Sequence, residues 1–311
     1  MGTYSMDISA MSPSLKQLAY IIAVQESGSF AKAAQKMNIS QSSILAAVDT
    51  IEQDLGIRIF SRQKGRGVYT TAAGEKFITS ARRLLMAEQE FSRDVRAQGQ
   101  DDESLRIGLF EPFSSIMMVE VLRRLRQQIG SISVELVEAD QPSLKRYLDR
   151  GEVDVVVVYD LGPDFTGTIE RIGRAPPHVM VHEDNPLAQY DAISISQLAQ
   201  QPVALLSLPL TMTYLMTLFD YSSHRPKIVF KSRSYDTIIR SVSNGFGATI
   251  LNAWPRTPLP LEQRTRRLRL TDPLPAPNVI TVDHYGDMRP RAVEVFINIL
   301  KEYFAEAYHH F

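Results

Sequence analysis

The stretch SFAKAAQKMNISQSSILAAVDTIEQDLGIRIFSRQKGRGVYTTAAG, residues 29–74, decides how the N-terminal part of the chain folds. Apolar residues recur in it at helical spacing, in two short runs. The runs are Phe30, Ala33, Ala34 and Met37, then Ile44, Val48, Ile51 and Leu55. Ser29 and Ser40 precede them as N-caps, and Asn38 ends the first helix because it tolerates a left-handed backbone. Two short helices a tight turn apart are typical of a helix-turn-helix.

A basic loop follows the second of these helices. Residues 57–61 and 68–70 are predicted strands, and Gly65 and Gly67 permit the turn between them. Three basic side chains fall at this turn, namely Arg62, Lys64 and Arg66. This pattern indicates a β-wing with a positively charged tip beside the helix-turn-helix.

The stretch resembles the N-terminal region of LysR-type transcriptional regulators, and the resemblance continues along the chain from about residue 15. It is carried by Ser29-Phe30, Ala33-Ala34, Ser40-Gln41, Glu52, Leu55-Gly56, Phe60, Arg62, Arg66, Thr71 and Gly74. None of these residues alone is specific to the family, but their ordered set over about sixty positions is specific to it. The resemblance implies a DNA-binding regulator that responds to a small-molecule effector.

Composition bounds the remaining possibilities. The 311 residues are enough for two or more domains, and 34 basic against 35 acidic residues leave no global field for nucleic acid. Absence of cysteine excludes disulfides and thiolate metal sites. Residues 1–13 lack the pattern of a signal peptide and are predicted to be a disordered leader, which favours a cytoplasmic protein.

The DNA contacts are predicted from the two helices and the wing, within a winged helix-turn-helix domain at 14–71. Gln and Ser side chains at the start of the second helix suit base edges, and basic side chains suit phosphates. The predicted residues are Ser29, Lys32, Ser40, Gln41, Ser42, Ser43, Arg62, Lys64 and Arg66. Leu45, Ala46, Ala47 and Asp49 leave this helix poor in donors, so we expect the wing to supply an unusually large share of affinity.

A long helix is predicted over 72–99. Its apolar seam recurs at spacings of three and four residues, at Phe77, Ala81, Leu84, Phe91 and Val95, with Glu88 as an imperfection. A seam this narrow favours pairing with a second copy, while packing within the chain remains the alternative. In the resembling family this segment is a dimerising linker helix, and family members often form tetramers.

Strands alternating with helices from residue 104 onward predict an α/β domain. The resemblance implies a periplasmic-binding-protein-like domain with a cleft between two subdomains. Subdomain I is predicted at 104–160 and 266–311, and subdomain II at 161–265. Residues 160–167, rich in Gly and Pro, are predicted to be the first crossover between them.

Residues at strand ends and helix starts are the candidates for the effector site. They are Phe110, Glu111, Phe113, Ser114, Gln141, Ser143, Tyr159, Ser207, Leu208, Ser234 and Asn252. Helix N-termini favour anions, so the expectation leans to an organic acid. Glu111 leaves the ligand's charge open, because it can instead orient an amine or hydroxyl.

An enzyme is not indicated. The six histidines are scattered, and neither a zinc-protease motif, nor a nucleophile elbow, nor a phosphate-binding loop occurs. We therefore expect no cofactor, no metal and no catalytic residues. The alternative function is a cytoplasmic α/β solute-binding protein without a role at DNA.

Overall fold

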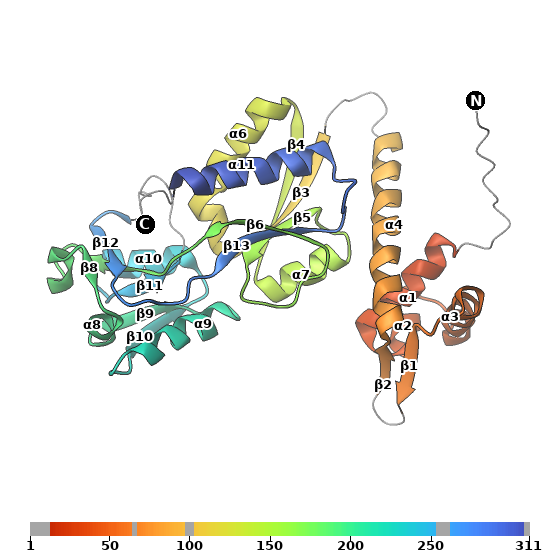
Figure 1. The fold of residues 1–311 in the computed structure, drawn as a ribbon, viewed down its shortest axis with the longest axis horizontal. Coiled ribbons are helices and arrows are strands. Elements are labelled where there is room, and N and C mark those ends of the chain that lie inside the picture. The colour runs from red at the N-terminus through yellow and green to blue at the C-terminus, as the bar shows by residue number, and fades with distance from the viewer. Residues whose placement is uncertain (1–12, 64–66, 97–102, 253–261, 308–311) are drawn as a thin grey trace. The chain divides into compact units, whose positions relative to one another are not determined.

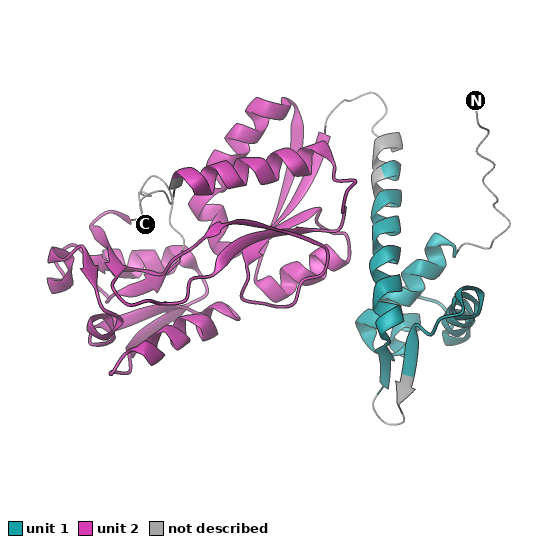
Figure 2. Ribbon diagram, viewed as in Figure 1, with its two compact units in different colours: residues 1–100 teal, residues 101–311 magenta. Residues whose placement is uncertain are grey.

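The computed structural model describes residues 13–63, 67–96, 103–252 and 262–307. The chain divides into two compact units, Met1–Gln100 and Asp101–Phe311 (Figure 2). Residues 1–12 of the predicted leader, the wing tip at 64–66 and positions 97–99 of the predicted linker helix lie outside the described residues. Within the described residues, no helix is at once long and apolar enough to cross a lipid bilayer.

The described part of the first unit contains helices and one antiparallel strand pair (Figure 1). Its elements are α1 (Leu15–Ser27), α2 (Phe30–Met37), α3 (Gln41–Leu55), β1 (Phe60–Gln63), β2 (Gly67–Thr70) and α4 (Ala72–Arg96). The predicted helix caps are confirmed. Ser29 accepts from the Lys32 N–H, Ser40 accepts from the Ser43 N–H, and Asn38 is left-handed with φ 54°.

The junction between wing and linker helix is fixed by Thr71 and Gly74. The Thr71 Oγ1 accepts from the Gly74 N–H at 2.9 Å, which caps α4, and donates to the Arg58 carbonyl. A Cβ atom added at Gly74 would lie 2.2 Å from the Ile59 carbonyl oxygen. Only glycine fits there, because no real Cβ approaches a backbone oxygen so closely.

A polar network ties α4 to the helices before it. Buried Arg82 donates to Gln25 at 3.0 Å and lies 3.7 Å from Glu26, which pairs with Lys36 at 2.6 Å. Ile78 of α4 joins the apolar core of this unit. The predicted seam divides, because its Ala81 is buried whereas its Leu84 and Phe91 are 51% and 67% exposed.

The second unit is built first on a five-stranded sheet of order β4-β3-β5-β13-β6. Its strands are β3 (Glu103–Phe110), β4 (Ile132–Ala139), β5 (Val155–Tyr159), β6 (Thr168–Arg174) and β13 (Asn278–Asp283). The strands β4, β3 and β5 run parallel, and β13 pairs antiparallel with both β5 and β6. All side chains of β5 are buried, as expected of a sheet covered on both faces.

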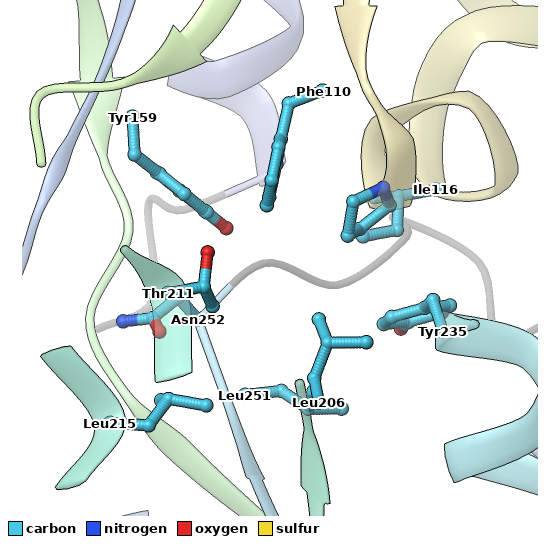
Figure 3. Close-up of a pocket in the computed structure, with 10 residues that line it drawn as sticks. Phe110, Ile116, Tyr159, Leu206, Thr211, Leu215, Tyr235, Leu251 and Asn252 are labelled. Atoms are coloured by element: carbon cyan, nitrogen blue, oxygen red, sulfur yellow. The ribbon is translucent and has the colours of Figure 1, made fainter. Parts of the chain in front are cut away.

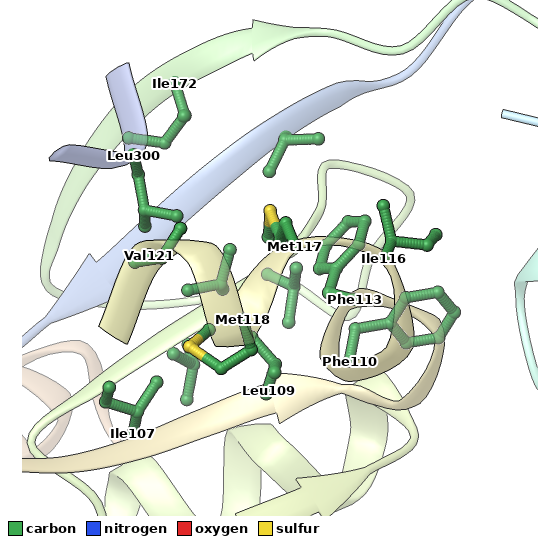
Figure 4. Close-up of a cluster of buried hydrophobic side chains, with 14 of the residues drawn as sticks. Ile107, Leu109, Phe110, Phe113, Ile116, Met117, Met118, Val121, Ile172 and Leu300 are labelled. Atoms are coloured by element: carbon green, nitrogen blue, oxygen red, sulfur yellow. The ribbon is translucent and has the colours of Figure 1, made fainter. Parts of the chain in front are cut away.

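Helices cover this sheet and close its core (Figure 4). They are α5 (Glu111–Phe113), the π-helical turn η1 (Ser114–Met118), α6 (Val119–Ile129), α7 (Gln141–Asp149) and α11 (Arg291–Ala307). Phe110 and Phe113 are fully buried and meet edge-to-face at 5.6 Å. The first of these helices begins at Glu111, directly after β3.

A four-stranded sheet of order β11-β7-β12-β8 and the parallel pair β10-β9 form the rest of the second unit. The strands are β7 (His178–His182), β8 (Ala192–Ile193), β9 (Pro202–Leu206), β10 (Lys227–Ser232), β11 (Thr249–Leu251) and β12 (Thr265–Leu270). The helices are η2 (Pro186–Gln189), α8 (Ile195–Ala199), α9 (Thr211–Leu218), η3 (Phe219–Tyr221) and α10 (Tyr235–Ser243).

Two predicted strand assignments are corrected. The strand β6, expected in subdomain II, pairs with β13 in the five-stranded sheet, and β12, expected in subdomain I, pairs with β7 and β8. The crossovers therefore lie at 175–177 and 271–277, where the Ala175 N–H donates to the Pro277 carbonyl at 2.9 Å. The Gly- and Pro-rich segment 160–167, predicted to be the first crossover, instead joins two strands of one sheet. Gly and Pro indicate where the chain turns, but not which sheet the next strand joins.

Candidate DNA-reading surface and effector cleft

The first turn of α3 stands open to solvent. Gln41, Ser42 and Ser43 are all exposed, as a helix that enters a major groove requires. Ser40 organises this turn, because its Oγ lies 2.9 Å from the Ser42 Oγ and 2.7 Å from the Ser43 Oγ. The amide of Gln41 is thus presented beside a linked set of hydroxyl groups, which can donate to or accept from base edges.

The two lysines of α2 differ in their surroundings. Lys32 is exposed, and its Nζ has no ion-pair partner within the described part of the chain. Lys36, one turn further on, pairs with Glu26 at 2.6 Å. Ser29 is half-buried and its hydroxyl serves as the cap of α2. Lys32 therefore has the free charge that a phosphate contact needs.

The wing is a short antiparallel ladder with Arg62 opposite Val68. Its predicted contacts are placed only in part. Arg62 belongs to β1, although its side chain lies outside the described atoms, and Lys64 and Arg66 lie outside the described residues.

Glu52 holds the wing against α3. This buried carboxylate accepts from the Ile59 and Phe60 N–H groups at 2.7 and 3.0 Å and pairs with Arg58 at 2.9 Å. Two of these donors are backbone amides. A buried carboxylate is tolerated only when its oxygens accept hydrogen bonds, and these amides supply them. The sequence pattern contained Glu52 as part of the resemblance, without indicating this role.

The outer face of α3 is poor in donors beyond its first turn. Ala46 and Asp49 are exposed, and the Thr50 hydroxyl donates to the Ala46 carbonyl at 2.8 Å. Methyl groups there can contact thymine methyls, whereas Asp49 repels phosphates.

A narrow cavity of about 20 Å³ lies between the two subdomains of the second unit (Figure 3). Its walls come from strand ends and helix starts, and they are lined by Phe110, Pro112, Ile116, Tyr159, Leu206, Thr211, Leu215, Tyr235, Leu251 and Asn252. This volume admits about one water molecule. Apolar residues of both subdomains, such as Phe110 and Leu206, belong to one continuous core.

Three predicted effector residues line the cavity: Phe110, Tyr159 and Asn252. Ser207 and Leu208 instead line an open groove of about 710 Å³ along the outside of α9. Leu206, Leu251, Thr211 and Tyr235 were missed, although the first two end strands and the last two begin helices. The rule that ligands bind at such ends identified the cavity, but not which side chain at each end faces it.

The remaining predicted residues support this wall from behind or cap helices. Phe113 meets the Tyr159 ring at 5.0 Å, and the Gln141 Oε1 accepts from the Tyr159 N–H at 2.7 Å. The hydroxyl of Ser114 donates to the Glu111 carbonyl at 3.2 Å.

Ser143 and Ser234 lie at helix starts. The Ser143 N–H donates to Asp140 at 3.0 Å, and Ser234 caps α10 by accepting from the Thr237 N–H at 3.2 Å. The Ser143 hydroxyl accepts from the Arg146 guanidinium at 2.8 Å, so both residues are used locally, at the starts of their own helices.

An ion-pair bridge crosses the cleft at the loop before α10. Arg233 lies 3.1 Å from Asp140 and 3.6 Å from Glu111, both of which belong to the other subdomain. Burial opposes ionisation of Asp140, but hydrogen bonds from Ser143 and Arg233 outweigh it and lower its pKa. Asp140 and Arg233 are therefore both charged at neutral pH.

Two polar groups stand out in the cavity wall. The Thr211 hydroxyl is buried and has no hydrogen-bond partner within residues 13–63, 67–96, 103–252 and 262–307. The Asn252 Nδ2 donates to the Ala175 carbonyl at 3.0 Å and to the Tyr214 hydroxyl at 2.9 Å. Burial raises the pKa of Tyr214 to about 12, so this phenol stays neutral.

Among the described residues, one group of metal-ligand types gathers, formed by His182, Glu183 and Asp184. Arg264 already binds both carboxylates, at 2.8 Å and 3.1 Å. Burial lowers the pKa of the other strand histidine, His178, well below its usual range, so it is neutral. Gly245 and Gly247 follow the end of α10 at Ser243.

Comparison with known proteins agrees with this architecture. Residues 15–75 match the bacterial regulatory helix-turn-helix protein, lysR family, and residues 98–305 match the LysR substrate binding domain. The chain is 27% identical over 241 residues to the HTH-type transcriptional regulator AlsR of Bacillus subtilis, covering 76% of this chain and 80% of that relative. It is 25% identical over 291 residues to the probable HTH-type transcriptional regulator LrrA of Synechococcus elongatus. This match covers 93% of this chain and 96% of that relative.

A solved structure shows the same likeness over nearly the full length of the chain. The putative LysR family transcriptional regulator PA01 from Pseudomonas aeruginosa is 25% identical, with a TM-score of 0.57, over 94% of this chain and 99% of that one. The exposed recognition turn and the two-subdomain α/β unit with its periplasmic-binding-protein-like fold fit the same assignment. The chain belongs to the LysR family of transcriptional regulators, with a helix-turn-helix domain followed by a substrate-binding domain.

Proposed function

We propose that this regulator binds specific duplex DNA through α3 and the wing, and that a small-molecule effector between the two α/β subdomains changes its activity. The observation that supports DNA reading best is the exposed first turn of α3, where Gln41 and Ser42 stand beside the Ser40 cap. The protein would act as a regulator without catalysis, in the cytoplasm where its DNA target lies.

The proposed assembly is a homodimer paired through the linker helix at 72–99, with a tetramer formed through the α/β units. Exposed Leu84 and Phe91, seven residues apart on α4, support the dimer because apolar side chains in that spacing form a coiled-coil seam. Paired winged helices would bind an inverted-repeat site in a promoter region. The effector must prefer one of two states of this assembly, since equal binding to both shifts nothing.

Fluorescence anisotropy with promoter fragments, measured at two salt concentrations, tests the DNA proposal. Gln41→Ala should lose about 1–3 kcal/mol on the preferred fragment and relax the sequence preference. Lys32→Ala should weaken all fragments similarly and reduce the salt slope by about one. Lys36→Ala is the matched control on the same helix, because Lys36 already pairs with Glu26. Equal binding to every fragment would contradict sequence-specific recognition.

The wing is tested in the same assay. Replacing Lys64 and Arg66 together with Ala should reduce the salt slope by about two and weaken all sequences alike, because phosphate contacts carry no base information. An unchanged slope would remove the wing from the interface.

A further inference from the structure

The cavity between the subdomains is lined by apolar and aromatic side chains. Among the described residues that line it, none carries a charge at neutral pH. An apolar lining stabilises apolar ligand surface, whereas a carboxylate moved there from water loses its hydration without gaining a cation. The lining therefore differs from that expected for the organic acid suggested by the sequence.

Thr211 supplies the unused hydrogen-bonding capacity of this lining. Thr211 is 3% exposed, and its Oγ1, which can both donate and accept, has no hydrogen-bond partner among the residues that the structure describes. Asn252 offers less, because its Nδ2 already donates to the Ala175 carbonyl and to the Tyr214 hydroxyl. The hydroxyl end of Tyr159 points toward the side of the cavity where Thr211 and Asn252 lie (Figure 3).

The start of α9 does not provide an anion site. A helix N-terminus binds anions through free amide groups in its first turn. Here the loop carbonyls take those donors: Thr211 N–H donates to Pro209 at 2.8 Å, and Met212 N–H donates to Leu208 at 3.0 Å. The first two N–H groups of α9 are thus already bound by the loop that precedes the helix.

The other two helix starts at the cavity are occupied as well. The helix α5 begins with the carboxylate of Glu111, and the next residue, Pro112, has no N–H. At the start of α10, Ser234 accepts from the Thr237 N–H, and Asp236 adds a negative charge in the first turn. Neither helix N-terminus is therefore free to bind a ligand carboxylate through its N–H groups and dipole.

The ion-pair bridge that Arg233 forms across the cleft also disfavours binding of an anion there. Its one guanidinium faces two carboxylates, Asp140 at 3.1 Å and Glu111 at 3.6 Å. The local charge is therefore negative when all three groups are ionised. A ligand anion arriving there would have to displace one of these carboxylates from Arg233.

From these observations we propose that the cleft binds an uncharged, largely apolar small molecule carrying one hydrogen-bonding oxygen, which Thr211 recognises, and discriminates against free carboxylates. This inference rests on the proposed effector site and specifies its ligand class. Since the cavity holds about one water, binding of such a molecule requires the subdomains to separate.

Two sets of matched compounds test the ligand class on the full-length protein. The probes are benzyl alcohol, benzylamine and benzoate, and cyclohexylmethanol, cyclohexylmethylamine and cyclohexanecarboxylate, titrated at neutral pH by ligand-observed NMR. At least one of the two alcohols should bind at least tenfold more tightly than its carboxylate. Thr211→Val, which keeps the shape and removes the hydroxyl, should weaken that alcohol about five- to tenfold, and Thr211→Ser should retain it.

Thr213→Val is the matched control, because Thr213 lies on the same helix but lines the outer groove. It should leave the alcohol's affinity unchanged. A carboxylate that binds more tightly than its alcohol, an alcohol indifferent to Thr211→Val, or failure of all six compounds to bind would overturn the proposal. Carboxylate binding that the cavity-filling Thr211→Phe abolishes would overturn the ligand class while leaving the proposed effector site in place.

Discussion

Single residues fix the geometry of the DNA-binding unit. Glu52 gathers two backbone amides and Arg58 at the point where α3 meets the wing. Thr71 caps α4, and Gly74 lets the helix approach the Ile59 carbonyl. The positions of the wing and the linker helix beside α3 thus depend on a few contacts, each of which a single substitution would remove.

Gly74→Ala should destabilise this unit by about 3 kcal/mol, because the added Cβ has no room beside a backbone oxygen. The measurement is the free energy of unfolding of the full chain by urea denaturation, together with DNA affinity. Gly56→Ala is the control, since Gly56 has φ +64° but open space around it, so its cost of about 1 kcal/mol is conformational only. Equal losses for the two variants would show that the close approach is unimportant.

At the scale of elements, α4 has two apolar faces. One face, with Ile78, packs into the core of its own unit, while Leu84 and Phe91 remain exposed. A large exposed side chain repeated after seven residues indicates a partner helix. The helix therefore serves both its own unit and the proposed dimer.

Leu84→Asp combined with Phe91→Asp should weaken the dimer at least a hundredfold, because burying each side chain contributes about 1.5–3 kcal/mol. Sedimentation velocity across a dilution series measures the change. Ala73→Asp is the control, since it adds an acid at an exposed position in the first turn of α4, where the helix dipole favours it. An unchanged dissociation constant in the double variant would exclude α4 from the interface.

The strand β6 is joined to α11 through one carboxylate, Glu170. Hydrogen bonding from Lys301 is the main cause that lowers the pKa of Glu170; burial opposes it and Arg289 adds to it. Since the folded-state pKa lies below the ordinary value of 4.5, this group stabilises the fold above that pH. The stabilisation is lost as the pH falls through the lowered pKa.

Glu170→Gln should cost about 1–2 kcal/mol at neutral pH and make the free energy of unfolding less dependent on pH below about 4.5. Urea denaturation at a series of pH values measures both effects. Glu138→Gln, at an exposed position of the same sheet, should change neither. A variant with the pH dependence of the wild type would show that Glu170 does not contribute to acid sensitivity.

For the substrate-binding unit as a whole, two crossovers connect the two subdomains, and the narrow cavity lies between them. The crossovers lie side by side, joined by the bond from Ala175 to Pro277. The Arg233 bridge to Asp140 and Glu111 spans the same division. This arrangement permits a hinge motion that would open the cavity to a ligand.

Arg233→Gln should favour the open cleft and raise hydrogen exchange several-fold at the start of α9 and in α10, because it removes the charged link between subdomains. Exchange followed by mass spectrometry on the full chain measures this. Arg264→Gln is the control, because Arg264 also pairs with two carboxylates, Glu183 and Asp184, but within one subdomain. Identical exchange in wild type and Arg233→Gln would show that the bridge does not hold the cleft closed.

The sequence by itself determined the caps of α2 and α3 and the alternation of strands and helices. Those features depend on neighbours a few residues away, so Ser29, Ser40 and Asn38 could be placed by local chemistry. The order of residues 29–74 was also enough to identify the family, which the comparisons confirm.

Only the tertiary structure decided the partners of β6 and β12, the place of the crossovers and which strand-end residues face the cavity. The strand β6 pairs with β13 more than one hundred residues away, and hydrophobic alternation carries no information about such a partner. The sequence likewise could not show that Thr211 keeps an unused hydroxyl in an apolar cavity, because satisfaction of a buried polar group depends on atoms brought together from distant segments.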